Sequence, residues 1–400
     1  MSRSALFEIS NIQSLKSAWA YIYKNSSQRS KNTKDINDES INSFAVKLDR
    51  HLKELSEDIR SKSGYKYSPL RAVLLPKPNG KYRVICIPTV RDRIVQRVLL
   101  NFLAINDKCK LINKVSYGFV QGRSAKQAAV IARNHRSKKK WAYKTDISQF
   151  FDNISRDDLK KLIKSSIKHH SLHSLLVDAI DCELAEYEGE RKKKIKKAGI
   201  LKGKGVRQGM PLSPFYANLV LKNFDSEIQS KGLSMVRYAD DLIILCKSKE
   251  ECHYIHNICK LELNKLTLSI PDPGVNSKTQ IYNPEEIAEF LGVGIVPSGK
   301  KYAIKILKDQ KNKIIQRIMD LADFKALMSE GVTIAKFGQR VEGVISGYID
   351  AYSHCDNLSQ LTEALDYSRE KSLRKIYVDG LGMDLTKLSP EKINFLGLGF

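Results

Sequence analysis

The spacing of apolar residues predicts two helices within the first sixty positions. One apolar set in residues 1–23 and another in residues 41–60 recur with the period of a single helix face. The two sets are Leu15, Ala18, Trp19 and Ile22, and then Phe44, Leu48, Leu52 and Leu55. The residues between them, 24–40, are polar and poor in apolar side chains, which predicts a flexible connection.

A β-hairpin pattern follows in residues 70–88, LRAVLLPKPNGKYRVICIP, where two apolar runs are joined by Pro-Asn-Gly. Residues 89–103 return to helical spacing, with Thr89 as the N-cap. Residues 141–155 predict a strand, a turn and then a helix that is opened by Ser155.

Strand and helix patterns continue to the end of the chain, with a basic insertion of little core potential at 183–205. We expect a loop and helix at 206–228, a hairpin at 234–246, a helix at 248–265, short strands at 276–296 and a mostly helical segment at 308–377.

The net charge of the chain indicates which class of binding partner to expect. Sixty-eight Lys and Arg against 44 Asp and Glu leave +24, spread along all 400 residues. Such an excess costs self-repulsion and is usually kept for a polyanionic partner, so nucleic acid is favoured over an anionic membrane. Seven scattered cysteines without a CxxC pair suit a reducing compartment, and no apolar run is long enough to cross a bilayer. We therefore expect a cytoplasmic protein with no membrane partner.

The stretch VRYADDLIILC, 236–246, places Asp240 and Asp241 side by side between apolar runs. Two neighbouring carboxylates repel, and a hairpin turn alone would favour Asn-Gly or Asp-Gly. Asp146 also ends a strand pattern, one helix-sized segment upstream. Strands of one sheet could gather all three around two Mg²⁺ ions about 3.5–4 Å apart, the arrangement used for in-line phosphoryl transfer. A solvated turn rich in aspartate is the alternative.

These segments resemble the reverse transcriptases, in the same order, from about residue 15 to about residue 355. The matching boxes are Tyr238-Ala239-Asp240-Asp241, Asp146 to Phe151, Arg207 to Pro214, Lys278-Thr279, Phe290-Leu291-Gly292, and the group II intron-type fingers segments 76–96 and 117–128. The resemblance implies an α+β fold, a right-hand polymerase with fingers, a palm of antiparallel sheet plus helices, and a helical thumb.

The resemblance also implies domain boundaries. They are an N-terminal helical extension at 1–60, fingers and palm at 61–300 (fingers mainly 61–140, palm mainly 141–300), a helical thumb at 301–385 and a C-terminal tail at 386–400. The implied activity is RNA-directed DNA polymerisation, with an RNA template, deoxynucleotides (dNTPs) and a cDNA product as partners.

Residue roles follow from the resemblance. Asp146, the backbone carbonyl of Ile147, Asp240 and Asp241 would hold two Mg²⁺ ions, or Mn²⁺ in their place. Lys77 and Arg83, with Lys81 as a companion, would clamp the triphosphate, while Gln208 and Gly209 would line the pocket floor. Phe151 would exclude a ribose 2′-hydroxyl, and Lys278 would protonate the leaving pyrophosphate.

Simpler interpretations stay open for several of these residues. Lys77 and Lys81 could be ordinary hairpin-tip charges, one of Phe150 and Phe151 could belong to the core, and Lys278 could be a surface residue. Asp152 and Asp157 are predicted to be turn or helix-start carboxylates rather than metal ligands.

Three other clusters of polar or charged residues can be explained without a binding site. Cys252, His256 and Cys259 share a helix face and could suggest zinc, but they equally form the apolar stripe of a packed helix. His169, His170 and His173 are predicted to form a solvated helix surface. The KKKIKK run at 192–197 is either a solvated loop or a contact to an RNA backbone.

The kind of reverse transcriptase is a separate question. The Asn-Ala-x-x-His and Val-Thr-Gly elements of retron enzymes are absent, Gln208-Gly209 is intact, and neither the DNA-binding region nor the endonuclease module usual in intron-encoded proteins is found. We therefore expect a stand-alone bacterial enzyme, most similar to the defence-associated reverse transcriptases that copy a structured non-coding RNA. A minimal intron-type or retron-like enzyme and a non-catalytic RNA-binding scaffold are the alternatives. The primer and the oligomeric state do not follow from the sequence.

Overall fold

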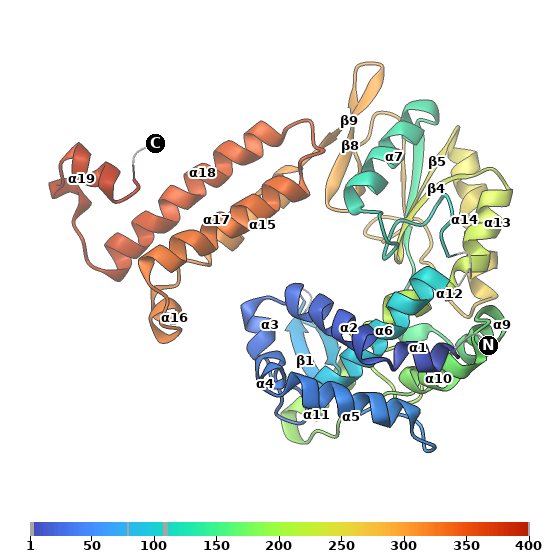
Figure 1. The fold of residues 1–400 in the computed structure, drawn as a ribbon. Coiled ribbons are helices and arrows are strands. Elements are labelled where there is room, and N and C mark those ends of the chain that lie inside the picture. Colours follow the sequence, from blue (N-terminus) through green and yellow to red (C-terminus); the bar gives the residue numbers. More distant parts are fainter. Residues whose placement is uncertain (1–3, 78–79, 107–110, 399–400) are drawn as a thin grey trace. The chain divides into compact units, whose positions relative to one another are not determined.

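A computed structural model describes residues 4–77, 80–106 and 111–398 (Figure 1). The chain divides into two compact units, each described by itself. The first unit comprises residues 1–121, 146–233 and 255–272, and the second comprises 122–145, 234–254 and 273–400.

Each of the two predicted N-terminal helices is divided in the structure. The first corresponds to α1 (Ala5–Ile9) and α2 (Ile12–Lys24), with all four predicted apolar residues on α2, and the second corresponds to α4 (Ile41–Val46) and α5 (Leu48–Arg60). Asn11 caps α2 through its side chain, and Ser40 and Ser43 form a capping box at α4. The predicted apolar faces are buried, and α2 packs against both α5 and α6 (Val90–Asn106).

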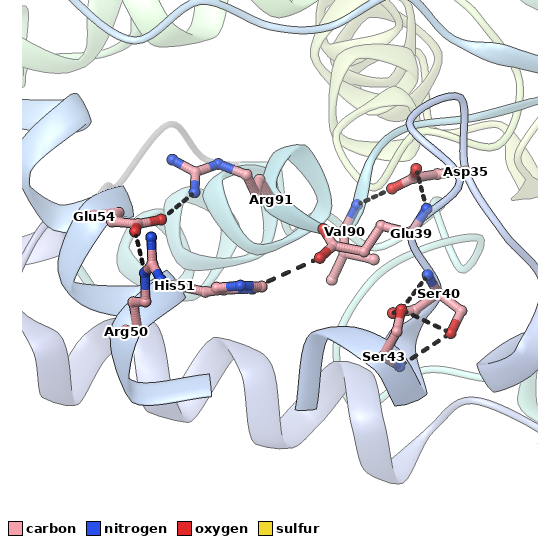
Figure 2. Close-up of polar contacts among 9 residues, drawn as sticks. All are labelled: Asp35, Glu39, Ser40, Ser43, Arg50, His51, Glu54, Val90 and Arg91. Carbon is pink, nitrogen blue, oxygen red and sulfur yellow. Dashed lines mark hydrogen bonds and ion pairs between the residues drawn. The ribbon is translucent and has the colours of Figure 1, made fainter. Parts of the chain in front are cut away.

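The prediction of a flexible connection is wrong for much of residues 24–40 (Figure 2). The segment contains a short helix, α3 (Gln28–Asn32), and after it a buried carboxylate, Asp35, that is only 4% exposed. Asp35 accepts hydrogen bonds from the backbone N–H groups of Val90 at 3.0 Å and Glu39 at 3.2 Å, so it caps α6 from outside that helix. Glu39 in turn lies 3.7 Å from Nδ1 of His51 on α5. Tertiary contacts thus order a segment that its polar composition marked as a linker.

The predicted hairpin is present as β1 (Arg71–Pro76) and β2 (Tyr82–Ile87), paired antiparallel with Leu75 opposite Arg83. Pro78 and Asn79 of its predicted turn lie outside the described residues. Thr89 accepts a hydrogen bond from the Asp92 N–H at 3.1 Å, which confirms it as the cap of α6.

Six further helices of the first unit follow β3 in the chain. They are α8 (Phe150–Asn153), α9 (Arg156–Ser166), α10 (His173–Ile180), α11 (Gly189–Lys197), α12 (Ser213–Val220) and α13 (Lys222–Ser230). Ser155 caps α9 as predicted. The three-histidine surface is only partly solvated, because the His169 ring packs edge-on against Phe102 at 4.9 Å and His173 Nε2 lies 2.8 Å from the Ile167 carbonyl.

The second unit contains a four-stranded sheet in the order β4-β5-β3-β6. The strands are β4 (Ser234–Tyr238), β5 (Asp241–Cys246), β3 (Trp141–Asp146) and β6 (Gln280–Tyr282). Helix α7 (Ala125–Lys138) contacts β4 and β5, and α14 (Lys249–Asn264) follows β5 as predicted. A buried hydrogen bond of 2.7 Å joins the hydroxyls of Thr145 and Thr279 across β3 and β6.

A second sheet, β7-β8-β9, precedes the C-terminal helices. Its strands are β7 (Ala288–Phe290), β8 (Val293–Ser298) and β9 (Lys301–Lys305), and the helices are α15 (Lys308–Met319), α16 (Phe324–Ser329), α17 (Ile334–Ala351), α18 (Leu358–Lys375) and α19 (Pro390–Phe395). Helices α15, α17 and α18 lie side by side around a shared apolar core (Figure 1).

The α17–α18 connection is bonded to the free edge of β9. The Asp356 carboxylate accepts from the Ile304 N–H at 2.7 Å, and the Asp356 N–H donates to the Ile304 carbonyl at 2.8 Å. Asn357 repeats the pattern with Ile306, accepting at 2.9 Å and donating at 3.1 Å. Three side-chain bonds and one backbone bond from Asp356 and Asn357 thus take the place of a fourth strand.

These antiparallel sheets and helices agree with the predicted α+β class. The domain boundaries at residues 60, 300 and 385 stay a prediction. Among the described residues, no helix combines the length and the apolar character required to cross a bilayer.

Candidate active site

The first unit presents three cations on one face of the β1–β2 hairpin. The Lys77 N–H donates to the Lys81 carbonyl at 2.8 Å, so these two residues oppose each other beyond the last strand pair. Arg83 is two positions further along β2, and residues two apart on a strand share a face. Lys77, Lys81 and Arg83 are all exposed. The hairpin therefore offers a triple positive charge to a ligand above it.

The segment after β3 turns sharply and separates the two phenylalanines. Gln149 has a left-handed φ of 45°, and α8 begins at the next residue. Phe150 is buried at 2% exposure, whereas Phe151 is only half-buried. This confirms that one of the pair belongs to the core and leaves Phe151 as the ring available to a substrate.

The Gln208–Gly209 loop is held between that segment and the β1–β2 hairpin. The Val206 N–H donates to the Phe151 carbonyl at 2.7 Å, and the Cys86 N–H donates to the Gln208 carbonyl at 2.7 Å. Gly209 has φ +109°, and a Cβ there would lie 2.6 Å from the Cys86 carbonyl oxygen. Gly209 therefore makes a close backbone approach to β2, and its predicted place on the floor of the nucleotide pocket stays a prediction.

A buried charge network fixes the base of this loop. Arg207 is 2% exposed and pairs with Glu183, whose other carboxylate oxygen lies 2.8 Å from Arg156. Burial alone would raise the pKa of Glu183, but hydrogen bonds from Arg207 and the Gly203 N–H outweigh it, so the pKa lies below its ordinary value of 4.5. Glu183 stays ionised between two guanidinium groups and ties the loop to the body of the unit.

Asp152 links the cations to the loop electrostatically. Burial raises the pKa of its carboxyl above the ordinary value, while Arg207 and Lys77 act in the opposite direction. Lys77 is thus close enough to influence a residue directly after Phe151. This places one predicted triphosphate ligand near the predicted sugar gate, within the same unit.

In the second unit, Asp240 lies at the tip of the β4–β5 hairpin. Tyr238 pairs with Asp241, which leaves Ala239 and Asp240 as a two-residue turn. Ala239 has φ 58°, a conformation that costs a non-glycine residue on the order of 1 kcal/mol. The guanidinium of Arg237, fully buried, donates to the Ala239 carbonyl at 3.0 Å. A strained turn held by a buried cation indicates a site selected for more than folding.

The strand order places β3 directly beside β5. The Lys144 Nζ lies 3.6 Å from Oδ1 of Asp241, and both side chains are about one-fifth exposed, at 21% each. Asp146 is the last residue of β3, two positions after Lys144. Lys144 is thus a cation beside one predicted metal ligand and on the strand of another.

Lys278 is exposed and lies two residues before β6 begins at Gln280. Gln280 pairs with Lys144 of β3, and Thr279, directly before the strand, bonds to Thr145. Lys278 therefore lies at the end of β6 where β3 leads into Asp146, which is compatible with its predicted role and does not test it.

The metal site itself stays a prediction. Among residues 4–77, 80–106 and 111–398, no three His, Cys, Asp or Glu side chains are grouped so that they could hold a metal ion. The residue types nevertheless fit magnesium, because Asp146, Asp240 and Asp241 each offer a half-buried carboxylate, and Mg²⁺ prefers such oxygen ligands.

The other predicted clusters have structural roles. Cys252 and Cys259 are fully buried, and His256 is 5% exposed with its Nε2 3.1 Å from Asp272, so this helix face belongs to the core as expected. Asp157 lies in the first turn of α9, as predicted for a helix-start carboxylate.

Sequence reasoning missed three positioning residues. Glu183 looked like part of a basic insertion, Lys144 like an ordinary strand residue, and Arg237 like an unremarked member of the aspartate box. The available signal was a charged residue inside an apolar strand pattern, as in VRYADD, because a buried charge needs a specific partner.

The chain is similar in sequence to several known proteins. The Escherichia coli K12 protein YkfC is 25% identical over 60% of this chain and 69% of its own length. The Lactococcus lactis subsp. cremoris group II intron-encoded protein LtrA is 25% identical over 76% of this chain but 59% of its own length. An Escherichia coli retron Ec73 reverse transcriptase is 25% identical over 70% of this chain and 82% of its own length.

Among solved structures, apo telomerase from Candida tropicalis, truncated from its C-terminal domain, is 16% identical. It covers 68% of this chain and 63% of its own, with a TM-score of 0.43. The model of the protein family described as "Reverse transcriptase (RNA-dependent DNA polymerase)" matches residues 75–295, which is more than half of the chain. This match contains the cationic hairpin, the Gln208–Gly209 loop and the strained Asp240 turn, and the chain belongs to the reverse transcriptase family.

Proposed function

We propose that the chain extends a primer with deoxynucleotides on an RNA template, using two divalent metal ions held by Asp146, the Ile147 carbonyl, Asp240 and Asp241. The observation that carries the proposal is the β4–β5 turn, where a strained Ala239 and a buried Arg237 present two adjacent carboxylates beside β3. When bound, magnesium would activate the primer hydroxyl and neutralise developing charge on the phosphates. Reverse transcriptases depend on divalent metals in general, and Mg²⁺ or Mn²⁺ fits this carboxylate set.

The chain's own residues would position the nucleotide. Lys77, Lys81 and Arg83 share one face of the fingers hairpin and would bind the triphosphate, arginine by two parallel hydrogen bonds. Gln208 and Gly209 would line the floor, and the half-buried Phe151 ring would exclude a 2′-hydroxyl. Lys278 would donate a proton to the pyrophosphate from the end of β6.

A charge-only substitution tests the metal ligands. Asp240→Asn should lower primer extension on a primed RNA template by at least about 10³-fold, or about 4 kcal/mol of transition-state stabilisation. Asp157→Asn, on the exposed first turn of α9, is the matched control and should leave extension unchanged. Mn²⁺ binding measured by electron paramagnetic resonance should fall in Asp240→Asn alone. Full extension by Asp240→Asn would rule out the assignment and favour a non-catalytic RNA-binding scaffold.

We propose further that the template is a dedicated structured RNA in the cytoplasm and that the cDNA acts in antiphage defence. The net charge of +24 suits an RNA partner, and the retron elements Asn-Ala-x-x-His and Val-Thr-Gly are absent from the sequence. RNA and cDNA recovered with the protein, with and without phage, should then be dominated by one template. A diverse or host-wide set of templates would contradict a dedicated RNA.

Group II intron function is the second candidate, because LtrA aligns with 76% of this chain. In that case the co-purified RNA would be an intron, and the protein would promote its splicing. The same sequencing experiment separates the two roles.

A further inference from the structure

We propose that the basic helix α11 (Gly189–Lys197) binds the phosphate backbone of the unpaired template strand ahead of the nucleotide site. The inference rests on the polymerase function proposed above. It concerns the segment that the sequence predicted to be a basic insertion of little core potential.

The fingers sheet carries the segment that leads into α11. The Leu70 N–H donates to the Glu183 carbonyl at 2.8 Å, and the Ala185 N–H donates to the Leu70 carbonyl at 2.9 Å. One step along β1, the Ala72 N–H donates to the Tyr187 hydroxyl at 2.8 Å. The chain before α11 therefore runs along the edge of β1, so the helix starts from a fixed point rather than from a solvated loop.

One face of α11 is used for anchoring. The Arg191 guanidinium stacks over the Tyr187 ring at 4.5 Å and donates to the Ala72 carbonyl. The Lys194 ammonium lies 5.8 Å from the centre of the Tyr82 ring on β2. Residues 191 and 194 are three apart, so they share the face of α11 that meets the hairpin.

The opposite face carries the charge. Lys192 and Lys196 are four apart, as are Lys193 and Lys197, and all four side chains are exposed. Within the described part of the chain, an ion pair is recorded only for Lys193, with exposed Glu190 at 3.4 Å. Like charges at this spacing destabilise a helix by a few tenths of a kcal/mol per pair, a cost that a polyanion would reverse. Solubility is a weak alternative explanation for this lysine-rich face, since the chain already carries a net charge of +24.

The position of Tyr82 excludes the triphosphate as the ligand. Tyr82 lies between Lys81 and Arg83, and neighbouring residues on a strand point to opposite faces. Because Tyr82 contacts α11, the helix lies on the face of the hairpin away from the cations assigned to the triphosphate. The strand that extends beyond an incoming nucleotide is the template not yet copied. A rigid row of four lysines behind the nucleotide clamp fits the phosphates of that strand.

The test is a salt titration of binding to the full-length protein without nucleotides. The variant changes Lys192, Lys193, Lys196 and Lys197 to Gln, and the probes are a primer–template with a single-stranded template overhang and the same duplex with blunt ends. Four phosphate contacts to a single strand contribute about 2.8 to the slope of log affinity against log salt. Between roughly 50 and 200 mM salt this equals about 50-fold in affinity, which the variant should lose for the overhang probe only.

The control removes the same charge from the same unit at Lys161, Lys164, Lys168 and Lys231, all exposed. An unchanged slope for the α11 variant, an equal loss with the control, or an equal loss on the blunt duplex would each overturn the proposal. Lys→Arg at the four α11 positions should restore the slope, which separates loss of charge from loss of folding. Because no incorporation is required, the result is independent of whether the chain proves to be a polymerase.

Discussion

Replacing Gly209 by alanine should damage both the stability of the first unit and its affinity for dNTPs. The added Cβ would lie 2.6 Å from the Cys86 carbonyl oxygen and 2.9 Å from the Ile85 side chain. Side-chain Cβ atoms essentially never come within 3.0 Å of such atoms, and ordinary contact begins at 3.4 Å. The loop and β2 must therefore separate by about 0.4 Å to reach 3.0 Å, or by about 0.8 Å to reach 3.4 Å.

That separation would stretch the hydrogen bond between β2 and the Gln208–Gly209 loop. The Cys86 N–H to Gln208 carbonyl distance of 2.7 Å would lengthen to about 3.1–3.5 Å, at or beyond the usual limit. A weakened buried hydrogen bond costs about 1 kcal/mol, and an alanine at φ +109° adds about 1–3 kcal/mol of backbone strain. The expected loss is about 2–4 kcal/mol. Gly232 has φ +67° with nothing within 4 Å, so Gly232→Ala should cost only about 1 kcal/mol.

Urea unfolding of the first unit measures the difference. The chain has two tryptophans, Trp19 and Trp141, and Trp19 alone belongs to this unit. In a Trp141→Phe background, the fluorescence of the buried Trp19 follows the first unit. We expect Gly209→Ala to lower the urea midpoint more than Gly232→Ala and to raise the KM for dNTPs about tenfold or more, because the pocket floor is displaced. Equal midpoints for the two variants, with an unchanged KM, would refute the close-approach argument.

Three further predictions use other contacts of the site. The pKa of Glu183 is lowered in the folded chain, so the stability that its ionised form contributes is complete above pH 4.5 and is lost as the pH falls through the lower folded-state value. Glu183→Gln should therefore cost about 2–4 kcal/mol of unfolding free energy at pH 7 and make stability fall less steeply in acid, and an equally steep fall in the variant would contradict this. Arg237→Met should loosen the Ala239 turn and lower kcat about 100-fold with little change in KM, and an unchanged kcat in steady-state extension assays would show that the bond is not needed. Phe151→Ala should admit ribonucleotides, raising their kcat/KM relative to dNTPs about tenfold or more, unless another side chain acts as the gate.

The local sequence pattern was enough to predict most helices, strands and turns near the site. The hairpin at 70–88, the cap at Thr89, the strand and helix around Ser155 and the turn at Asp240 all appear where the sequence placed them. These features depend on alternation, capping and turn spacing, which act within a few residues. The motif order, recognised by resemblance, supplied the candidate residues that no periodicity could select.

Features set by distant partners were not predictable in the same way. Composition made residues 24–40 a linker, yet Asp35 caps a helix more than fifty positions away. The lysine-rich run became helix α11 because Tyr187 and Arg191 bond to β1. Gly209 was assigned to nucleotide approach, whereas its nearest neighbour is the Cys86 carbonyl. In each case the deciding contact joins residues whose proximity exists only in the folded chain.

The side-chain bonds on the outer edge of β9 have a consequence for association between molecules. An uncovered edge strand exposes a row of N–H and C=O groups that can recruit a strand from another copy and start aggregation. Asp356 and Asn357 occupy those groups at Ile304 and Ile306, so an intruding strand would first have to displace four intramolecular bonds. These two residues of the α17–α18 connection therefore protect the chain against strand addition by another copy.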